Sequence, residues 1–203
     1  MFLRQRPSAV MFIVLAALLP VEAATLSRQS ADAFSQKVAA IRGHADRASQ
    51  AGTRRTRITE DEFNSWFRYH GEAWQEMLPA GVTHPEVSIV GDGRVAARAL
   101  VNLDAVAKRR SRVGAFDPLS LIGGTVPVVV TGVVHTREGS ARFEVQSAEV
   151  SGIPVPVTVL QELVSYYSRT PERPAGVRLD EAFALPVGIR RVEIGKGQAV
   201  VVQ

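Results

Sequence analysis

The sequence of 203 residues contains no cysteine. This absence excludes disulfide scaffolds, cysteine-ligated zinc, iron–sulfur clusters and thiol catalysis. It also excludes a lipoprotein anchor, which is attached to a cysteine. Aromatic residues are scarce, at 6%, although 46% of the residues are hydrophobic. That balance is typical of a globular chain rather than a disordered one, and the length fits one domain of ordinary size.

Motifs for catalysis and cofactor binding are also missing. The chain has no Gly-x-Ser-x-Gly elbow and no Ser-x-x-Lys, and its four histidines show no metal-ligand spacing. The two Gly-x-Gly sequences, at 91–93 and 195–197, fall in expected hairpins rather than before helices, so they do not predict a phosphate loop. The acidic run 60–62 is explained by helix capping. We therefore expect no metal, no cofactor and no enzymatic activity.

The first 23 residues have the features of a cleavable export signal. Arg4 and Arg6 precede an apolar run at 9–19, which Pro20 ends, and small residues lead to cleavage after Ala23. The alternative is a retained membrane anchor, but the run is about half of the ~20 apolar residues that a spanning helix needs. No later stretch is long and apolar enough to span a bilayer. The sequence predicts a periplasmic or other extracytoplasmic protein.

Residues 24–55 are predicted to form an N-terminal helix and a basic linker, and residues 56–203 a single α+β domain. The helix, expected over 30–51, has a thin alanine-rich apolar stripe, which predicts loose docking. After the linker at 53–57, Thr59 and Glu62 form a capping box that starts a second helix. Its apolar face holds much of the aromatic content of the chain, namely Phe63, Trp66, Phe67 and Trp74.

From residue 84 the hydrophobic period changes from helical to alternating. Residues 95–103 alternate apolar with polar or small side chains, which is typical of a half-buried antiparallel strand. The valine-rich run 126–134 predicts a strand covered on both faces. Further alternation around Phe143 and Val145, a helix over 157–167 and a last hairpin around 195–197 complete the order. We expect a curved antiparallel sheet of about six strands packed on two or three helices.

Two basic clusters stand out against the modest net charge of +4. They could meet anionic lipid headgroups, at about 1 kcal/mol per basic residue near a membrane surface. Solvated loops are the alternative. Nucleic acid is not an expected partner, because no aromatic residues interleave with these clusters. The headgroup candidates are Arg54, Arg55, Arg57, Lys108, Arg109, Arg110 and Arg112.

Three segments carry a family resemblance: the helix start Ile58–Ser65, the sequence Gly152–Pro156 before a helix, and Leu185–Ile189 before the terminal hairpin. In these segments and in the order of its elements, the chain resembles exported lipid-binding proteins of the LmeA and YpmS type, from about Thr56 to Gln203. These proteins are placed with the tubular lipid-binding (TULIP-like) folds. The resemblance implies a half-barrel sheet wrapped about a helix, an apolar groove for lipid and no catalytic residues to carry over.

The resulting hypothesis is a non-catalytic envelope protein that shelters the acyl chains of a phospholipid or similar amphiphile. Apolar walls with few polar groups are what such a ligand requires. The alternative is a structural or adaptor protein with a solid core and a protein partner. The residues expected to line the groove are Phe63, Trp66, Phe67, Val95, Ala97, Val101, Phe143, Val145, Leu160 and Val164.

Overall fold

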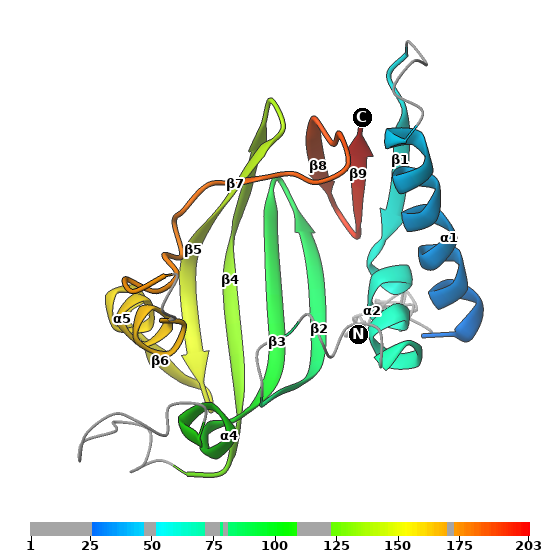
Figure 1. Cartoon of the computed structure of the whole chain (residues 1–203). Helices are drawn as coiled ribbons and strands as arrows, with labels where there is room; N and C mark the ends of the chain where they lie inside the picture. The colour runs from blue at the N-terminus through cyan, green and yellow to red at the C-terminus, as the bar shows by residue number, and fades with distance from the viewer. Residues whose placement is uncertain (1–25, 47–51, 72–77, 79–80, 109–122, 170–172) are drawn as a thin grey trace, which may run out of the picture.

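A six-stranded antiparallel sheet forms the largest layer of the computed structural model, which describes residues 26–46, 52–71, 78, 81–108, 123–169 and 173–203 (Figure 1). Its strands, in spatial order, are β2 (Val82–Gly91), β3 (Arg94–Asn102), β4 (Thr125–Arg137), β5 (Ser140–Val150) and β6 (Ile153–Val155), with β7 (Phe183–Ala184) also on β5. All neighbours are antiparallel, and the sheet stays open as a curved half-barrel. The predicted α+β class is confirmed.

Tight hairpins connect β2 to β3, β4 to β5 and β5 to β6. The turns Asp92-Gly93, Glu138-Gly139 and Ser151-Gly152 each place two successive residues at positive φ. This backbone matches the right-handed twist of the flanking strands, and glycine adopts it without a steric penalty. From β2 to β6 each strand is adjacent in space to the next one in the sequence, and the alternating pattern of the sequence becomes a sheet with two different faces.

A second, three-stranded sheet has the order β1 (Arg55–Thr59), β9 (Gln198–Val202) and β8 (Arg191–Gly195). The predicted terminal hairpin is present as β8 and β9, but the linker predicted at 53–57 is wrong, because most of it belongs to β1. In β1 the arginines are exposed, and Thr56 and Ile58, which alternate with them, are partly buried. This alternation is typical of a strand, but the arginines led to the prediction of a basic linker.

Four described helices accompany the sheets: α1 (Arg28–Ala45), α2 (Glu60–Tyr69), α4 (Leu103–Lys108) and α5 (Val157–Tyr167). In Figure 1, α1 and α2 lie beside β1 and α5 lies at the opposite side of the large sheet. The loose docking predicted for the first helix is wrong. Its Ala31, Phe34 and Ile41 are buried, because small alanines let α1 approach α2 closely and Phe34 fills the space between them.

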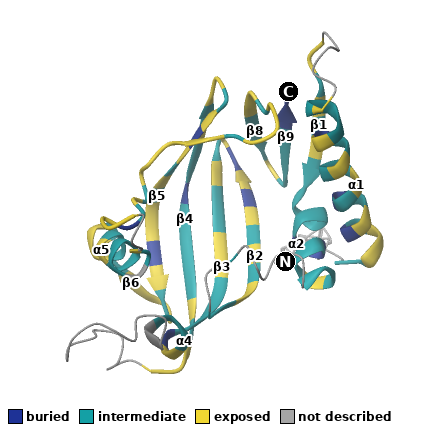
Figure 2. Ribbon diagram, viewed as in Figure 1, coloured by how far each residue is buried: buried dark blue, intermediate teal, exposed yellow. Residues whose placement is uncertain are grey.

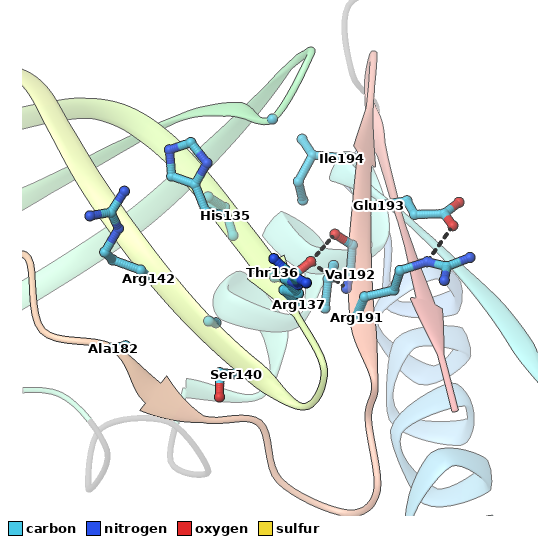
Figure 3. A pocket seen from close by; sticks show the side chains of 13 residues that line it. His135, Thr136, Arg137, Ser140, Arg142, Ala182, Arg191, Val192, Glu193 and Ile194 are labelled. Carbon is cyan, nitrogen blue, oxygen red and sulfur yellow. Dashed lines mark hydrogen bonds and ion pairs between the residues drawn. The ribbon is translucent and has the colours of Figure 1, made fainter.

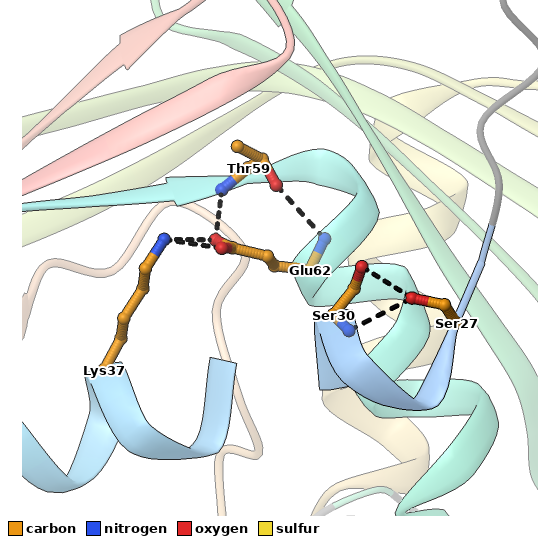
Figure 4. Close-up of polar contacts among 5 residues, drawn as sticks. All are labelled: Ser27, Ser30, Lys37, Thr59 and Glu62. Carbon is orange, nitrogen blue, oxygen red and sulfur yellow. Dashed lines mark hydrogen bonds and ion pairs between the residues drawn. The ribbon is translucent and has the colours of Figure 1, made fainter. Parts of the chain in front are cut away.

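Caps fix where α1 and α2 begin (Figure 4). Thr59 Oγ1 accepts from the backbone N–H of Glu62 at 3.2 Å, and the carboxylate of Glu62 accepts from the backbone N–H of Thr59 at 2.9 Å, as the capping box predicts. Lys37 of α1 donates to the same carboxylate at 2.6 Å. Ser27 caps α1 by accepting from the N–H of Ser30 at 3.1 Å. The two helices are thus joined at the cap of α2.

The free edge of β2 is bound by side chains of α2. Asn64 donates to the carbonyl of Val87 and accepts from its N–H, both at 2.8 Å, and Glu60 accepts from the N–H of Ile89 at 2.5 Å. The β8–β9 turn completes this edge, since the N–H of Gly197 donates to the carbonyl of Ile89 at 2.8 Å. Side chains and a turn therefore occupy groups that an edge strand otherwise offers to other chains.

Well-buried apolar side chains are found in α1 and the small sheet, whereas the described strands of the large sheet contribute Ile89, Ala141 and Ala148. Ala31, Phe34, Ile41, Val201 and Val202 are all at most 7% exposed. In Figure 2, most of β3 and β4 is coloured as intermediate or exposed instead. The valine-rich strand β4 was predicted to be covered on both faces, and this is wrong: every valine in it is only partly buried. Valine favours the extended backbone of a strand whether or not another layer covers that strand, so a run of valines does not predict burial on both faces.

Candidate functional site: an apolar face of the large sheet

One face of the large sheet is lined by apolar side chains across five strands. Residues paired across antiparallel strands share a face, so the register defines its members. We call this surface the apolar face. It consists of Val82, Val87, Ile89, Val95, Ala97, Ala99, Val101, Val126, Val128, Val130, Gly132, Val134, Ala141, Phe143, Val145, Ala148, Val150, Ile153 and Val155.

The apolar face is only partly covered. Ile89, Ala141 and Ala148 are buried, but the other side chains on this face are intermediate or exposed, and Ala97 is exposed in the interior strand β3. An apolar side chain on an interior strand is normally under a second layer, because burial is the main stabilising term in folding. The chain therefore leaves an apolar surface available in the middle of its largest sheet.

The opposite face of the same strands is more polar, although it also carries Leu100, Val129 and Val133. It presents Glu86, Ser88, Arg98, Arg142 and Glu149, all of them exposed, at positions that alternate with the apolar face. A sheet with one solvated face normally packs its other face on a core. Here the amphipathic pattern of a covered sheet is present, but the cover is incomplete.

The ring of Phe143 lies over Gly132 on the apolar face. A side chain at Gly132 would meet the Phe143 ring, because a Cβ there would stand 2.6 Å from its Cζ atom. The glycine therefore makes room for the ring, an arrangement that also covers the bare backbone of a glycine in a strand. Phe143, predicted as a groove residue, thus forms part of the floor of the apolar face.

The small sheet covers one end of the apolar face, where Thr136 of β4 exchanges two hydrogen bonds with the backbone of Val192 in β8. Thr136 Oγ1 donates to the carbonyl at 2.9 Å and accepts from the N–H at 3.0 Å. A pocket of about 640 Å³ opens at this junction (Figure 3), and its lining includes Val134 of β4, Ala141 of β5, and Val192 and Ile194 of β8. Its size is in the range of small-molecule sites.

Charged side chains surround this pocket in pairs. Glu144 lies 3.1 Å from His135 Nε2 and 3.5 Å from Arg142 Nη2. Arg191 and Arg55 both bind Glu193, and these contacts, that of Arg55 first, hold the pKa of Glu193 below its usual value. The residues that line the pocket thus include more arginine than glutamate, whereas Val134 and Ala141 connect it to the apolar face.

The groove residues predicted on the strands lie together. Val95, Ala97, Val101, Phe143 and Val145 are all on the apolar face. The other two non-aromatic candidates are Leu160 and Val164 of α5. Both are partly buried, and α5 packs against β5.

The aromatic candidates of α2 have a different set of ring contacts. Phe63 and Trp66 lie 5.3 and 5.2 Å from the ring of Phe34, and Phe67 lies 4.8 Å from Phe63. Phe34 was not predicted as a partner, although its place on the apolar stripe of α1 was a usable signal. These rings mainly join α1 to α2, and Phe67 also lines a second pocket, of about 800 Å³, with the start of β2.

The basic candidates separate into described and undescribed residues. Arg54 pairs its backbone with Gln203, Arg55 binds Glu193, and Arg57 is exposed on β1. Lys108 ends α4, and its side chain is not described. Arg109, Arg110 and Arg112, like the predicted signal segment 1–23, lie outside the described residues.

In the part of the chain that the structure describes, no group of three metal-ligating side chains comes together, and no helix is both long and apolar enough to cross a membrane. Comparisons of the chain with protein-family models, with curated proteins and with solved structures found no match. The resemblance to LmeA- and YpmS-type proteins therefore stays a prediction, and any function has to be argued from the apolar face itself.

Proposed function

We propose that this chain is a non-catalytic lipid-binding protein that holds an acyl chain of a phospholipid or similar amphiphile against the apolar face. One observation carries the proposal: the apolar face extends over five strands, yet Ala97 at an interior position is exposed and its valine neighbours are only partly buried. Export through the segment 1–23 belongs to the same proposal, since lipids of the envelope would then be the available ligands.

The chemistry of the surface favours an acyl chain. Soluble monomers rarely expose contiguous apolar patches larger than a few hundred Å² unless the patch binds something. Each methylene group that moves from water onto such a surface contributes about 0.8 kcal/mol. A hydrocarbon chain needs no hydrogen-bond partners, and the valine and alanine side chains of β3 and β4 offer none.

The dimensions of the sheet also suit a lipid. The 13 residues of β4 span about 40 Å at roughly 3.3 Å per residue. One leaflet of a bilayer has a hydrocarbon thickness of about 15 Å. The apolar face is therefore long enough for a complete acyl chain, with the 640 Å³ pocket at the β8 end available for the remainder of the molecule.

The adaptor alternative predicts a filled interior. The partial exposure of Val95, Val130 and Phe143 counts against a solid core under the large sheet. A protein partner that covers the apolar face would be recognised by a stable protein complex that contains no lipid.

Native mass spectrometry tests the proposal after incubation of the purified protein with a phospholipid delivered from cyclodextrin. We expect a lipid-bound mass that Ala97→Glu removes and that Ala96→Glu retains. These two residues are neighbours in β3 and lie on opposite faces of the sheet. The comparison therefore separates an effect on lipid binding at the apolar face from a general effect of glutamate on folding. An apo mass alone for the unmodified chain, or equal loss in both variants, would contradict the proposal.

A further inference from the structure

A corner between β6 and α5 exposes apolar side chains at the far side of the large sheet from α1. Ile153 is 67% exposed, which is the largest value among the large hydrophobic side chains that the structure describes, and Val159 is 44% exposed. Pro154 and Pro156 are exposed between them. The twelve residues 150–161 include no charged side chain. We call Ile153, Pro154, Pro156 and Val159 the apolar corner.

Local structure holds this corner outward. The two-residue turn Ser151-Gly152 reverses the chain, and β6 then pairs with β5 over only three residues. On another side of α5, Gln161 binds the backbone of the segment that follows the helix. Its side chain accepts from the N–H of Leu179 at 2.7 Å and donates to the carbonyl of Val177 at 3.1 Å. With its polar flank bonded to the protein, α5 leaves Val159 on the solvent side.

One side of α5, on which Val159 is exposed and Leu163 and Tyr166 are partly buried, has the pattern of a helix at a membrane interface. Val159, Leu163 and Tyr166 recur at i, i+4 and i+7, and the guanidinium of Arg169 lies 5.8 Å from the centre of the Tyr166 ring. Apolar residues followed by a tyrosine and an arginine suit the change from hydrocarbon to headgroup. Although α5 is rich in apolar residues, none of its described side chains is fully buried.

The apolar corner is also continuous with the apolar face. Ile153 pairs with Val150 and Val155 pairs with Ala148, and paired residues share a face of the sheet. An acyl chain that enters at Ile153 would therefore reach β5 and β4 without crossing a polar surface. A protein partner would gain nothing from this continuity, whereas a lipid that leaves a bilayer requires it.

We infer that the apolar corner contacts the surface of a phospholipid bilayer and is the place where lipid passes to the apolar face. The inference rests on the proposed function. Nearby charges offset one another, with exposed Glu149 and Glu162 against exposed Arg169 and Arg173. Insertion of apolar side chains rather than attraction of opposite charges therefore drives this contact, and salt has little effect on it.

Co-sedimentation with phosphatidylcholine vesicles tests the inference, using the full chain so that residues 1–25 are the same in every variant. We expect Ile153→Glu and Val159→Glu each to lower the vesicle partition coefficient about tenfold, because each removes a large apolar contact and introduces a charge. Val90→Glu is the matched control: Val90 is 47% exposed but lies away from the corner, and we expect no change. Raising the salt should change binding less than twofold.

Lipid delivered from cyclodextrin separates this inference from the proposed function. We expect Val159→Glu, whose side chain lies on α5 and not on the apolar face, to load lipid normally from cyclodextrin and at least about tenfold more slowly from vesicles. If the unmodified chain loads no lipid from either cyclodextrin or vesicles, the proposed function is overturned, but the contact of the corner with vesicles is not. Unchanged vesicle binding and loading in both corner variants, or a protein dimer that Ile153→Glu dissociates, would overturn the inference.

Discussion

The two ends of the molecule use apolar residues in different ways. Around α1, α2 and the small sheet, apolar side chains meet one another: Phe34 is 7% exposed between the rings of Phe63 and Trp66, and Val202 is 2% exposed. On the large sheet, the described residues leave an equally apolar face without a complete cover, and Ala97 is exposed. We expect the first region to supply more of the stability, and we propose that a ligand covers the apolar surface of the second.

Phe34→Ala should have the largest effect on stability, since it empties the contact between α1 and α2. We expect the free energy of unfolding to fall by about 3–5 kcal/mol, the usual range for removing a buried phenylalanine. Urea denaturation monitored by circular dichroism measures it. Phe183→Ala is the control, because Phe183 is 55% exposed and should change stability little. Similar losses in the two variants would remove the distinction between the regions.

Asn64→Ala tests how α2 joins the two regions. Asn64 is 7% exposed and makes both hydrogen bonds to the edge of β2 at Val87. Removing them leaves backbone groups unpaired, and we expect a loss of about 2–3 kcal/mol. Asn64→Asp keeps an acceptor for the N–H of Val87 and should fall between. Hydrogen exchange should accelerate at Val87, and unchanged protection there would contradict this role.

Ala97→Glu and Ala96→Glu compare the two faces of β3 directly. Because a glutamate is mildly unfavourable in a strand and neither side chain is fully buried, both should cost less than about 1 kcal/mol of unfolding free energy. Thermal denaturation gives the values. A much greater loss in Ala97→Glu alone would mean that the apolar face is a covered core rather than an open surface.

Glu193→Gln should have the smallest effect, because its ion pairs with Arg55 and Arg191 are exposed. These arginines lower the pKa of Glu193 from its ordinary 4.5, so its contribution is complete above that pH and is lost as the pH falls through the folded-state value. The melting temperature of the variant should therefore be slightly lower near pH 7 and equal to that of the unmodified chain in strong acid. A difference that grows in acid would contradict the assignment.

Local signals in the sequence predicted much of the fold. The capping box at Thr59 and Glu62 formed as predicted, because it depends on residues only three apart. The alternation in β3 and β5 placed Val95, Ala97 and Phe143 on one face, since the period of a strand is fixed. These predictions depend on neighbours in the chain and needed no knowledge of the tertiary structure.

Predictions that depend on distant neighbours were weaker. The strand β1 was assigned to a linker because its partner β9 lies about 140 residues away and two of its own five residues are arginine. The contact of Asn64 with Val87 has no signal in the sequence, since an asparagine within a helix usually faces solvent. The valines of β4 indicated a strand but not whether another layer covers it.

Photo-crosslinking tests the central claim most directly. A phospholipid whose acyl chain carries a diazirine is loaded onto the protein, irradiated and mapped by peptide mass spectrometry. We predict adducts on the residues of the apolar face in β3, β4 and β5, and their loss in Ala97→Glu. Adducts confined to the polar face of the same strands, or to the rings between α1 and α2, would contradict a lipid site on the apolar face.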